Sequence, residues 1–561
     1  MRISFFLALA LSLVTANCLA DTQAARFSWF TYEGRDSQFA EALKPGHFQN
    51  PILAGFYPDP SITRVGDTFY MVHSSFSYFP GVPIFKSTDL VNWQSLGYVL
   101  TRPEQLRVPH AGVSRGIFAP AIRHHKGVFY VITTGIDDAG GNFIVTATDP
   151  TGPWSDPIFL PEIDGIDPSM FFDDDGKVYI THNGPPTGTP LYEGHRAIWM
   201  WEYDAAKQKV VSNSQRLLVN GGVDLSKKPI WIEAPHIYKI NDWYYLFCAE
   251  GGTADNHSEV VFRTRDLKEP FVPAPKNPIL TQRDLDPNRV NPIATAGHVD
   301  IVQTPSGEWW AVFLATRNYD KQFFNTGRET FLLPLTWTDG WPQILPPSTA
   351  IPSQLPIPKG LKPTANATAL TGNFQWRDDF SQPQLGFEWN LLRTSPELPY
   401  RLAPNGLQLD ARKTSMADLS QPAFIGRRQQ HQTYSASTRL NLPLANTVTA
   451  GIVVFQSEQA HYFLGVESLG NKGAYRLVLE KAESGPPQIM QSKELPGQAG
   501  NHIDLKIEGD KGLVGFYYRT ATDKQWQLLA DKLDATLLST QKAGGFVGSY
   551  LGVHARLKSG K

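Results

Sequence analysis

The chain has 561 residues, of which 41% are hydrophobic and 19% charged, and its formal net charge is −2. This length exceeds what one ordinary hydrophobic core accommodates, so the sequence predicts two domains. The near-zero net charge excludes a basic field that would draw in nucleic acid.

The N-terminus has the residue order of a secretory signal. Arg2 precedes an apolar run from Ile3 to Val14, and the string "TANCLA" ends at Ala20. The run is short for a membrane span, so we predict a cleaved signal peptide over residues 1–20, no membrane span, and export to the periplasm or the extracellular space. Lipid attachment at Cys18 is the alternative, which the preceding Asn17 disfavours. Residues 21–46 are predicted to form an N-terminal extension.

A turn that carries Gly or Asp, followed by an aromatic strand, occurs five times between residues 47 and 345. Such strand–turn–strand units are typical of propeller blades, which bury both faces against their neighbours. The sequence therefore predicts an all-β fold that begins with a five-bladed β-propeller over residues 47–345. The repeated strings are "GDTFYMVHSS", "KGVFYVITTG", "DGKVYITHNG", "NDWYYLFCAE" and "SGEWWAVFLA", with the aligned aromatics Tyr70, Tyr130, Tyr179, Tyr245 and Trp310.

Eleven or twelve positions before these aromatics, the repeats carry polar or aromatic residues that would begin the innermost strand of each blade. They are Asp59 in "YPDPSI", Phe118 or Ala119 in "IFAPAI", Asp167 in "GIDPSM", Glu233 in "WIEAPHI" and His298 in "TAGHVDI". Equivalent positions on inner strands face the central axis, so these side chains are predicted to converge on one pocket. Strand propensity does not demand them, because Asp and Glu are poor strand formers.

Each of these residues also has a purely structural interpretation. Asp59 and Asp167 precede prolines, where aspartate commonly initiates a turn, and His298 is compatible with a buried core histidine. Three acids in register favour the functional interpretation. Two carboxyl groups facing one pocket are the minimum for glycoside hydrolysis, and a third raises the pKa of the acid by like-charge repulsion.

The composition and the hydrophobic pattern of the sequence change after the repeats. Residues 346–371 are rich in Pro, Ser and Thr and are predicted to form a linker. Residues 372–561 carry short alternating runs such as "TYSASTRLNL" and "TAGIVVFQSE", joined by Gly and Asn turns. This pattern predicts a C-terminal antiparallel β-sandwich of the jelly-roll type.

The strings "FYPDPSI", "GIDPSMFFDDDGKVYI", "WIEAPHIYK", "TAGHVDIV" and "TGRETFLLPL" resemble glycoside hydrolase family 43. The resemblance runs from about Asn50 to Leu345. The C-terminal region resembles the concanavalin-like sandwich of the β-xylosidase and α-L-arabinofuranosidase members. The resemblance implies a five-bladed propeller with an axial site and hydrolysis with inversion.

By motif, the resemblance implies that Asp59 is the general base, Glu233 the general acid and Asp167 the third carboxylate, which positions the acid and raises its pKa. His298 resembles an axial histidine that in some members lies near a bound calcium or other cation. The other implied substrate-binding residues are Arg328 in "TGRETF", Phe76 in "SSFSYFPG", Phe118, where many members have Trp, and Tyr550 in "GGFVGSYLG".

The predicted function is an exported, inverting exo-glycosidase that needs no cofactor. It would remove terminal α-L-arabinofuranosyl or β-D-xylosyl residues from arabinoxylan, arabinan, xyloglucan or their oligosaccharides. The sequence favours the arabinofuranosidase slightly over the xylosidase. An endo-arabinanase and a non-catalytic carbohydrate-binding propeller are the alternatives, and the oligomeric state stays open.

Overall fold

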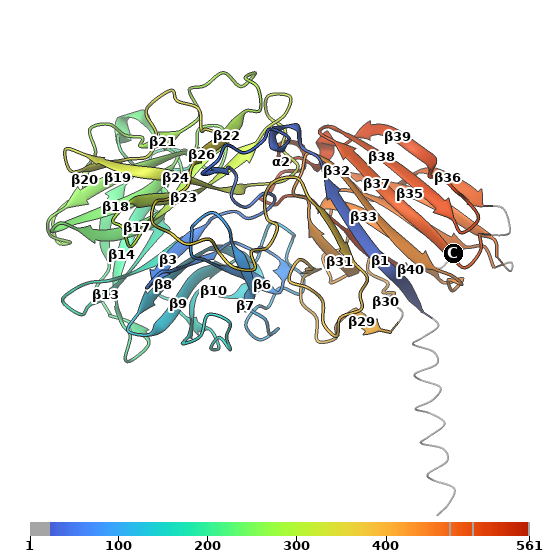
Figure 1. The fold of residues 1–561 in the computed structure, drawn as a ribbon. Coiled ribbons are helices and arrows are strands. Elements are labelled where there is room, and N and C mark those ends of the chain that lie inside the picture. Colours follow the sequence, from blue (N-terminus) through green and yellow to red (C-terminus); the bar gives the residue numbers. More distant parts are fainter. Residues whose placement is uncertain (1–22, 405, 471–472, 496–498, 559–561) are drawn as a thin grey trace, which may run out of the picture. The chain divides into compact units, whose positions relative to one another are not determined.

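The computed structural model describes residues 23–404, 406–470, 473–495 and 499–558 (Figure 1). The predicted signal peptide, residues 1–20, lies outside the described residues. The described chain divides into two compact units. The "five-sheet unit" spans Ser37–Gly372, and the "two-sheet unit" joins the described residues up to Asp36 to those from Asn373 onward. Among the helices of the described residues, none is long and apolar enough to cross a membrane.

Antiparallel sheets of four or five strands follow one another along the five-sheet unit. In chain order of the described residues they are β3 (Ser61–Val65), β4 (Thr68–Val72), β6 (Gly81–Ser87) and β7 (Gln94–Leu100); β8 (Ile117–His125), β9 (Val128–Gly135), β10 (Gly141–Ala147) and β11 (Ile158–Phe159); β12 (Ile166–Phe172), β13 (Val178–Gly184), β14 (Ala197–Asp204), β15 (Lys209–Val210) and β16 (Arg216–Asn220); β17 (Glu233–Ile240), β18 (Trp243–Glu250), β19 (Ser258–Thr264), β20 (Val272–Pro273) and β21 (Leu280–Thr281); and β22 (Ile293–Gln303), β23 (Trp309–Arg317), β24 (Glu329–Thr338) and β25 (Trp341–Gln343). A short strand, β5 (Tyr78–Phe79), lies between β4 and β6.

The first strands of these sheets contact one another in a closed ring. Strand β3 contacts β8, β8 contacts β12, β12 contacts β17, β17 contacts β22, and β22 returns to β3. The aromatic strands predicted from the repeats are the second strands, β4, β9, β13, β18 and β23. The repeat pattern therefore identified the hairpins that bring the five first strands together.

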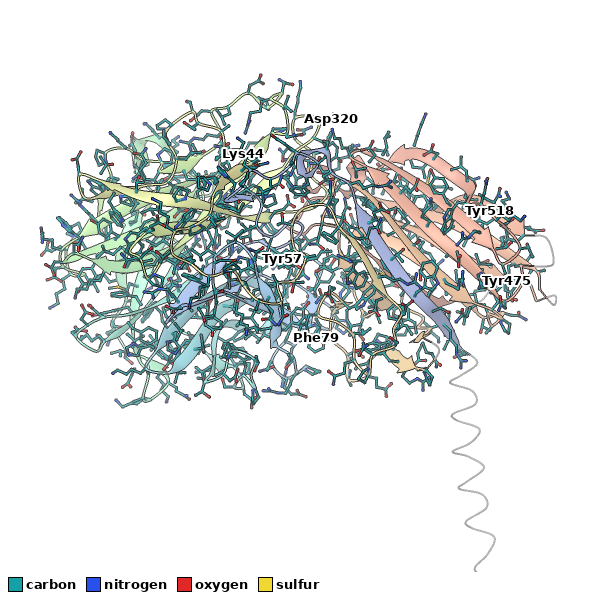
Figure 2. All side chains as sticks on the ribbon, in the orientation of Figure 1. Lys44, Tyr57, Phe79, Asp320, Tyr475 and Tyr518 are labelled. Carbon is teal, nitrogen blue, oxygen red and sulfur yellow. The ribbon has the colours of Figure 1, made fainter. Side chains whose placement is uncertain are left out.

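The segment predicted as a linker, residues 346–371, is packed onto the five-sheet unit. Strand β26 (Gln354–Pro356) pairs with β2 (His47–Gln49), and Ile351, Leu355 and Leu370 are buried in the same core as the labelled Tyr57 (Figure 2). The apolar residues between the prolines account for this difference, because burying them removes apolar surface from water. The boundary of the unit accordingly falls at Gly372.

The two-sheet unit is a pair of antiparallel sheets. The larger sheet has the order β29 (Tyr400–Ala403), β30 (Gly406–Asp410), β1 (Ala24–Gly34), β32 (Thr433–Asn441), β37 (His502–Asp510), β38 (Leu513–Thr520) and β39 (Gln527–Asp534), with β27 (Gln375–Asp378) also on β1. The smaller sheet has the order β31 (Ala423–Arg428), β40 (Tyr550–Leu557), β33 (Val448–Ser457), β34 (Ala460–Ser468), β35 (Tyr475–Glu483) and β36 (Gln488–Leu495). Strand β28 (Leu391–Leu392), a 3₁₀ turn (Thr536–Leu538) and helix α2 (Thr540–Ala543) complete this unit.

The N-terminal extension predicted over residues 21–46 contains a strand of the two-sheet unit. Strand β1 pairs with β32 on one side and with β27 and β30 on the other. Its side chains alternate between buried and partly exposed, as a strand covering one side of a core requires. The buried Tyr518 of the larger sheet and Tyr475 of the smaller sheet, labelled in Figure 2, belong to this unit's interior.

Candidate active site

The first strands of the five-sheet unit share an unusual backbone feature. Within or just before each strand, an equivalent residue other than glycine has a left-handed backbone: Asp59 (φ 52°), Ala119 (33°), Asp167 (54°), Ala234 (51°) and His298 (59°). Strand β22 has a second such residue, Thr295 (57°). In β8, β12, β17 and β22 the pairing register shifts at this place, which marks a β-bulge. Such bulges change the direction in which a side chain points. A residue other than glycine in the left-handed conformation costs about 1–3 kcal/mol of folding free energy, so contacts with the surrounding structure must stabilise that conformation.

The bulges define the register of the repeats and correct one detail of the sequence alignment. The aligned aromatics pair directly with Thr63, Arg123, Phe171, Tyr238 and Val302. Four positions before these partners, in the same order, lie Asp59, Ala119, Asp167, Ala234 and His298. Glu233 therefore precedes the left-handed residue of its repeat and is equivalent to Phe118, whereas the two aspartates are themselves the left-handed residues. Connections of unequal length between the strands caused the offset.

Asp59 is held by three neighbours. Arg328 Nη1 donates to Asp59 Oδ1 (2.5 Å) and Arg328 Nη2 to Oδ2 (3.3 Å). Ser74 Oγ donates to Oδ2 (2.5 Å), while the backbone N–H of Ala119 donates to Ser74 Oγ (2.7 Å). The Nδ1 atom of His298 lies 3.8 Å from Asp59 Oδ1. The buried carboxyl is thus fixed by residues from three separate segments of the five-sheet unit.

These contacts keep Asp59 ionised. Burial alone would raise the pKa of its carboxyl, but the positive charge of Arg328, then that of His298, and the hydrogen bond from Ser74 outweigh burial, and the net pKa is lowered. Burial lowers the pKa of His298.

Asp167 and Glu233 have the opposite electrostatic setting. Burial raises the pKa of Asp167 first, the charge of Asp59 raises it further, and the backbone N–H of Ala234 opposes both. Burial, then the charges of Asp167 and Asp59, raise the pKa of Glu233 well above its ordinary value. Glu233 Oε1 accepts a long hydrogen bond from Thr253 Oγ1 (3.5 Å). The acid set therefore combines a carboxyl group whose pKa is lowered with two whose pKa values are raised.

Aromatic rings adjoin this acid set. The rings of Phe76 and Phe118 lie 4.9 Å apart, and Phe56 lies 5.7 Å from Phe76. The Arg328 guanidinium carbon lies 5.7 Å from the Phe76 ring centroid. The structure thus brings together seven of the eight site residues predicted from the sequence: Asp59, Phe76, Phe118, Asp167, Glu233, His298 and Arg328.

The eighth predicted residue, Tyr550, belongs to the two-sheet unit. It lies on β40, where its hydroxyl is 3.4 Å from Asn390 Oδ1 and the Arg428 guanidinium carbon is 5.5 Å from its ring. Its place in the sugar pocket stays a prediction. As for the cation expected near His298, no group of three or more His, Cys, Asp or Glu side chains suited to a metal occurs among the described residues.

The sequence reasoning missed a polar cluster beside Glu233. The Nε and Nη2 atoms of Arg196 donate to Asn183 Oδ1 (3.1 and 2.9 Å), and Asn183 Nδ2 donates to the backbone oxygen of Ile232 (2.5 Å). The guanidinium of Arg196 also lies over Trp231, 5.0 Å from its ring centroid, and 39% of Trp231 is exposed. Burial lowers the pKa of Arg196, while the negative charges of Asp164, then Glu233 and Asp167, oppose this effect. No motif marked this residue.

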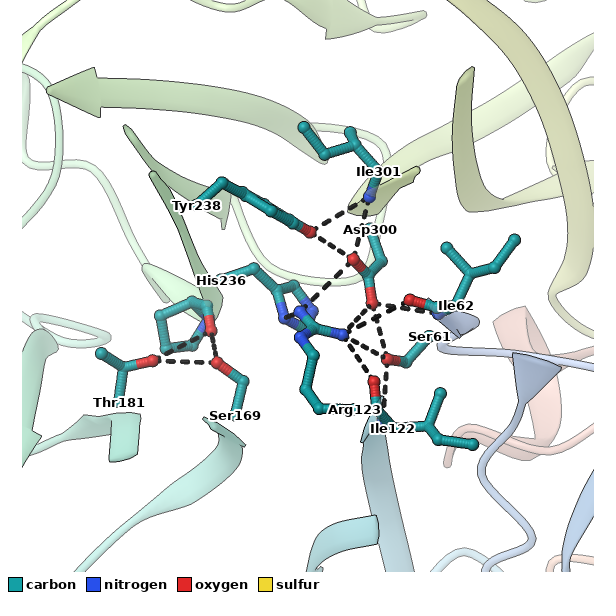
Figure 3. A network of polar contacts seen from close by, with 11 residues as sticks. Ser61, Ile62, Ile122, Arg123, Ser169, Thr181, His236, Tyr238, Asp300 and Ile301 are labelled. Carbon is teal, nitrogen blue, oxygen red and sulfur yellow. Dashed lines mark hydrogen bonds and ion pairs between the residues drawn. The ribbon is translucent and has the colours of Figure 1, made fainter. Parts of the chain in front are cut away.

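A second polar layer lies one step along the same strands (Figure 3). Asp300 accepts hydrogen bonds from Ser61 Oγ (2.6 Å), Arg123 Nη1 (2.8 Å) and the hydroxyl of Tyr238. Arg123 Nη2 lies 2.9 Å from His236 Nδ1. Burial would raise the pKa of Asp300, yet Arg123 and these hydrogen bonds hold it below its ordinary range. This layer links four of the first strands, β3, β8, β17 and β22, through hydrogen bonds.

Glu259, a buried residue of β19, holds the left-handed backbone around His298. Its Oε2 accepts the N–H of Val299 (3.0 Å), and its carboxyl also accepts the N–H of His298. Burial raises the pKa of Glu259 well above its ordinary value, although the two N–H groups oppose this, and glutamine is the closest neutral replacement that can still accept their hydrogen bonds.

We expect Glu259→Gln to keep the stability and activity of the parent. Glu259→Ala leaves two buried N–H groups without their acceptor, so it should lower the free energy of unfolding by about 1–3 kcal/mol. It should also lower kcat, because His298 is released. Urea unfolding and steady-state kinetics of both variants test this expectation. Equal losses in the two variants would contradict it.

A sequence profile of Glycosyl hydrolases family 43 matches residues 48–342. A profile of the Beta xylosidase C-terminal Concanavalin A-like domain matches residues 377–560. The chain is 37% identical to a xylosidase/arabinosidase of Butyrivibrio fibrisolvens over 519 residues, covering 90% of this chain and 95% of that relative. It is 35% identical to a non-reducing end alpha-L-arabinofuranosidase of Bacteroides ovatus over 532 residues, or 91% of each chain.

Solved structures agree with these matches. A GH43_12 protein retrieved from a capybara gut metagenome superposes with a TM-score of 0.89 at 40% identity, covering 95% of this chain and all of that one. A xylan beta-1,4-xylosidase from Bacillus halodurans gives a TM-score of 0.80 at 31% identity, covering 92% and 97%. From these matches and the acid set in its five-sheet unit, we conclude that the chain is a glycoside hydrolase and belongs to glycosyl hydrolases family 43.

Proposed function

We propose that the chain is an inverting exo-glycosidase that removes terminal α-L-arabinofuranosyl or β-D-xylosyl residues from hemicellulose. The observation that carries the proposal is the unequal environment of buried carboxyl groups at the first strands of the five-sheet unit. Asp59 forms an ion pair with Arg328, whereas Glu233 lies beside two other carboxyl groups. Hydrolysis of a glycoside needs such a pair, one group ionised and one protonated.

We further propose that the five sheets are the blades of a β-propeller. The closed ring of contacts among β3, β8, β12, β17 and β22 supports this arrangement, because the innermost strands of a propeller surround its axis. The bulged residues would then face one axial pocket, and the Asp300 layer would fill the axis beneath it.

In the proposed reaction, Asp59 is the general base. Its carboxylate takes a proton from a water molecule whose oxygen attacks the anomeric carbon of the terminal sugar. Arg328, Ser74 and His298 keep the carboxylate ionised and oriented. A carboxylate has about four acceptor positions, so these contacts leave room for the water.

Glu233 is the proposed general acid. Its carboxyl donates a proton to the glycosidic oxygen as the bond to the anomeric carbon breaks. Asp167 raises the pKa of Glu233 through its negative charge, so that the acid is still protonated when Asp59 is already ionised. Phe76, Phe118, Arg328 and His298 would hold the terminal sugar. The cluster of Arg196 and Trp231 beside Glu233 would contact the leaving group.

The choice of substrates rests on the relatives. The names of the two reported relatives contain xylosidase, arabinosidase or arabinofuranosidase, and one specifies the non-reducing end. These names favour an exo-acting enzyme over the alternative of an endo-arabinanase. The signal-like sequence of residues 1–20 supports export, so the proposed substrates are plant cell-wall polysaccharides or their oligosaccharides outside the cytoplasm.

The test is hydrolysis of an aryl α-L-arabinofuranoside and an aryl β-D-xyloside, followed by proton NMR. We expect pentose release from at least one substrate, and the first product anomer should have the configuration opposite to that of the substrate. This requires the carboxyl groups of Asp59 and Glu233 to lie about 6.5–9.5 Å apart. If the retained anomer appeared first, Asp59 would be a nucleophile. If neither substrate nor arabinoxylan fragments were cleaved, the proposed specificity would fail.

The role of Asp167 predicts a change in the pH profile. When Asp167 is ionised, its charge raises the pKa of Glu233, so Asp167→Asn should lower that pKa. The basic limb of kcat/KM, where the acid loses its proton, should therefore move to lower pH. A matched control is Asp173→Asn, which removes a buried carboxylate that pairs with Lys239 and Tyr244. A basic limb that stays in place or moves upward in Asp167→Asn contradicts this role.

A further inference from the structure

The two-sheet unit has a groove on its larger sheet that the proposed reaction does not use. The groove encloses about 510 Å³, within the range of pockets that bind small ligands. It crosses strands β27, β1, β32 and β37 and reaches Trp526, just before β39. All of its lining residues belong to the two-sheet unit.

Strand register explains why the sheet is hollowed here. In one row across the strands, Arg377 pairs with Thr31, Thr31 with Ser437, and Ser437 with Lys506. In the next row, Gln375 pairs with Glu33, Glu33 with Ser435, and Ser435 with Glu508. Each row has long side chains at both ends and at least one short hydroxyl side chain between them. The hydroxyls of Thr31 and Ser437 lie 2.7 Å apart on the floor.

The charges along the groove are balanced by their neighbours. Lys506 Nζ donates to Glu508 Oε1 (2.6 Å), Arg35 Nε lies 3.4 Å from Glu33 Oε1, and Arg377 Nε donates to Asp379 Oδ1 (2.9 Å). A groove with paired charges creates little net field, so it does not select an anion or a cation. It instead presents hydroxyls, carboxylates and an amide that can exchange hydrogen bonds with a neutral, hydroxyl-rich ligand.

One end of the groove carries an aromatic ring that is held in place. The Nζ atom of Lys506 lies 4.9 Å, and the guanidinium carbon of Arg519 4.8 Å, from the Trp526 ring centroid. These cation–π contacts restrain an indole that is only partly buried. A restrained indole next to a floor of hydroxyls suits a sugar ring, which has an apolar face and a polar rim.

We propose that this groove binds a segment of a neutral hemicellulose chain, separately from the acid set. The choice of hemicellulose, rather than another neutral glycan, rests on the proposed function. Such a site would retain the enzyme on a long polysaccharide without taking part in the chemistry.

The test uses the full chain carrying Asp59→Asn, so that the polysaccharide is not consumed. The dissociation constants for soluble arabinoxylan and xyloglucan are measured by affinity electrophoresis and calorimetry, with and without a groove substitution. Trp526→Ala removes the ring, and Ser437→Tyr fills the floor with a residue that strands accommodate well. We expect each substitution to weaken binding to one of the two polysaccharides by about tenfold or more. Leu528→Ala, an exposed position on β39 outside the groove lining, is the control and should leave binding unchanged.

The same groove substitutions are then made in the otherwise unmodified enzyme. Hydrolysis of a small aryl glycoside should be unchanged, whereas hydrolysis of the polysaccharide at low concentration should fall. Unchanged affinity for both polysaccharides in Trp526→Ala and Ser437→Tyr would overturn the proposal. If Trp526→Ala does not fold, the affinity of Ser437→Tyr for the two polysaccharides decides whether the proposal holds. This result is independent of the aryl glycoside assay, so a failure here is distinguishable from a failure of the proposed function.

Discussion

Replacing Asp59 with asparagine is expected to lower kcat/KM by about 10²–10⁴-fold on every substrate, because the attacking water loses its base. The loss should be the same for a natural oligosaccharide and for a glycoside with an activated aryl leaving group, since both reactions need the same water. Asparagine retains the shape of the side chain and can still accept a hydrogen bond from Arg328, but it cannot take up a proton. Steady-state kinetics on both substrates measure the effect.

Stability has to be separated from catalysis in this experiment. Arg328 is buried, and removing the partner of a buried charge costs about 3–5 kcal/mol. The same measurements on Asp173→Asn, which removes a buried carboxylate from its ion pair with the partly exposed Lys239, provide a comparison for losses that follow from destabilisation alone. Added azide offers a second check in Asp59→Ala, because an anionic nucleophile needs no base and should give the inverted glycosyl azide. Full activity in Asp59→Asn would exclude Asp59 as the base.

Much of the five-sheet unit could be predicted from the sequence, because its hairpins repeat. Each turn and aromatic strand leaves a local signal, and the acids stand at a nearly constant distance before it. The prediction placed Asp59 and Asp167 in their structural register but displaced Glu233 by one position. Local patterns could not reveal this offset, because it depends on how many residues form the turn between the first and second strands of each sheet.

Long-range pairing explains the other differences. Strand β1 alternates like any other strand, yet nothing within it indicates that its partners are β27, β30 and β32, hundreds of residues away. The same holds for Glu259, which reaches His298 only because β19 and β22 contact each other. Arg196 lies near Glu233 through Asn183. Glu259 and Arg196 act through hydrogen bonds to neighbouring residues, and no sequence motif identifies residues of this kind.

Substituting alanine for Glu233 should produce a loss that depends on the leaving group. Natural oligosaccharides leave as basic alkoxides that need a proton, so kcat/KM should fall by about 10²–10⁴-fold. A dinitrophenyl glycoside leaves as a stable phenolate without help, and its hydrolysis should be far less impaired. The basic limb of the pH profile should also disappear on the activated substrate, because it reports the loss of the proton from the acid, whose pKa burial and the charge of Asp167 raise.

Asp167→Asn is the matched comparison, because burial raises the pKa of Asp167 as well and makes it the rival candidate for the acid. Its amide preserves size and still accepts the N–H of Ala234. If Glu233 is the acid, Glu233→Ala should discriminate most strongly between the natural and the activated substrates. Asp167→Asn leaves the acid in place and only lowers its pKa, so its discrimination should be smaller and should shrink as the pH is lowered. The opposite pattern would exchange the two roles. Similar losses on both substrates in both variants would mean that neither residue protonates the departing oxygen.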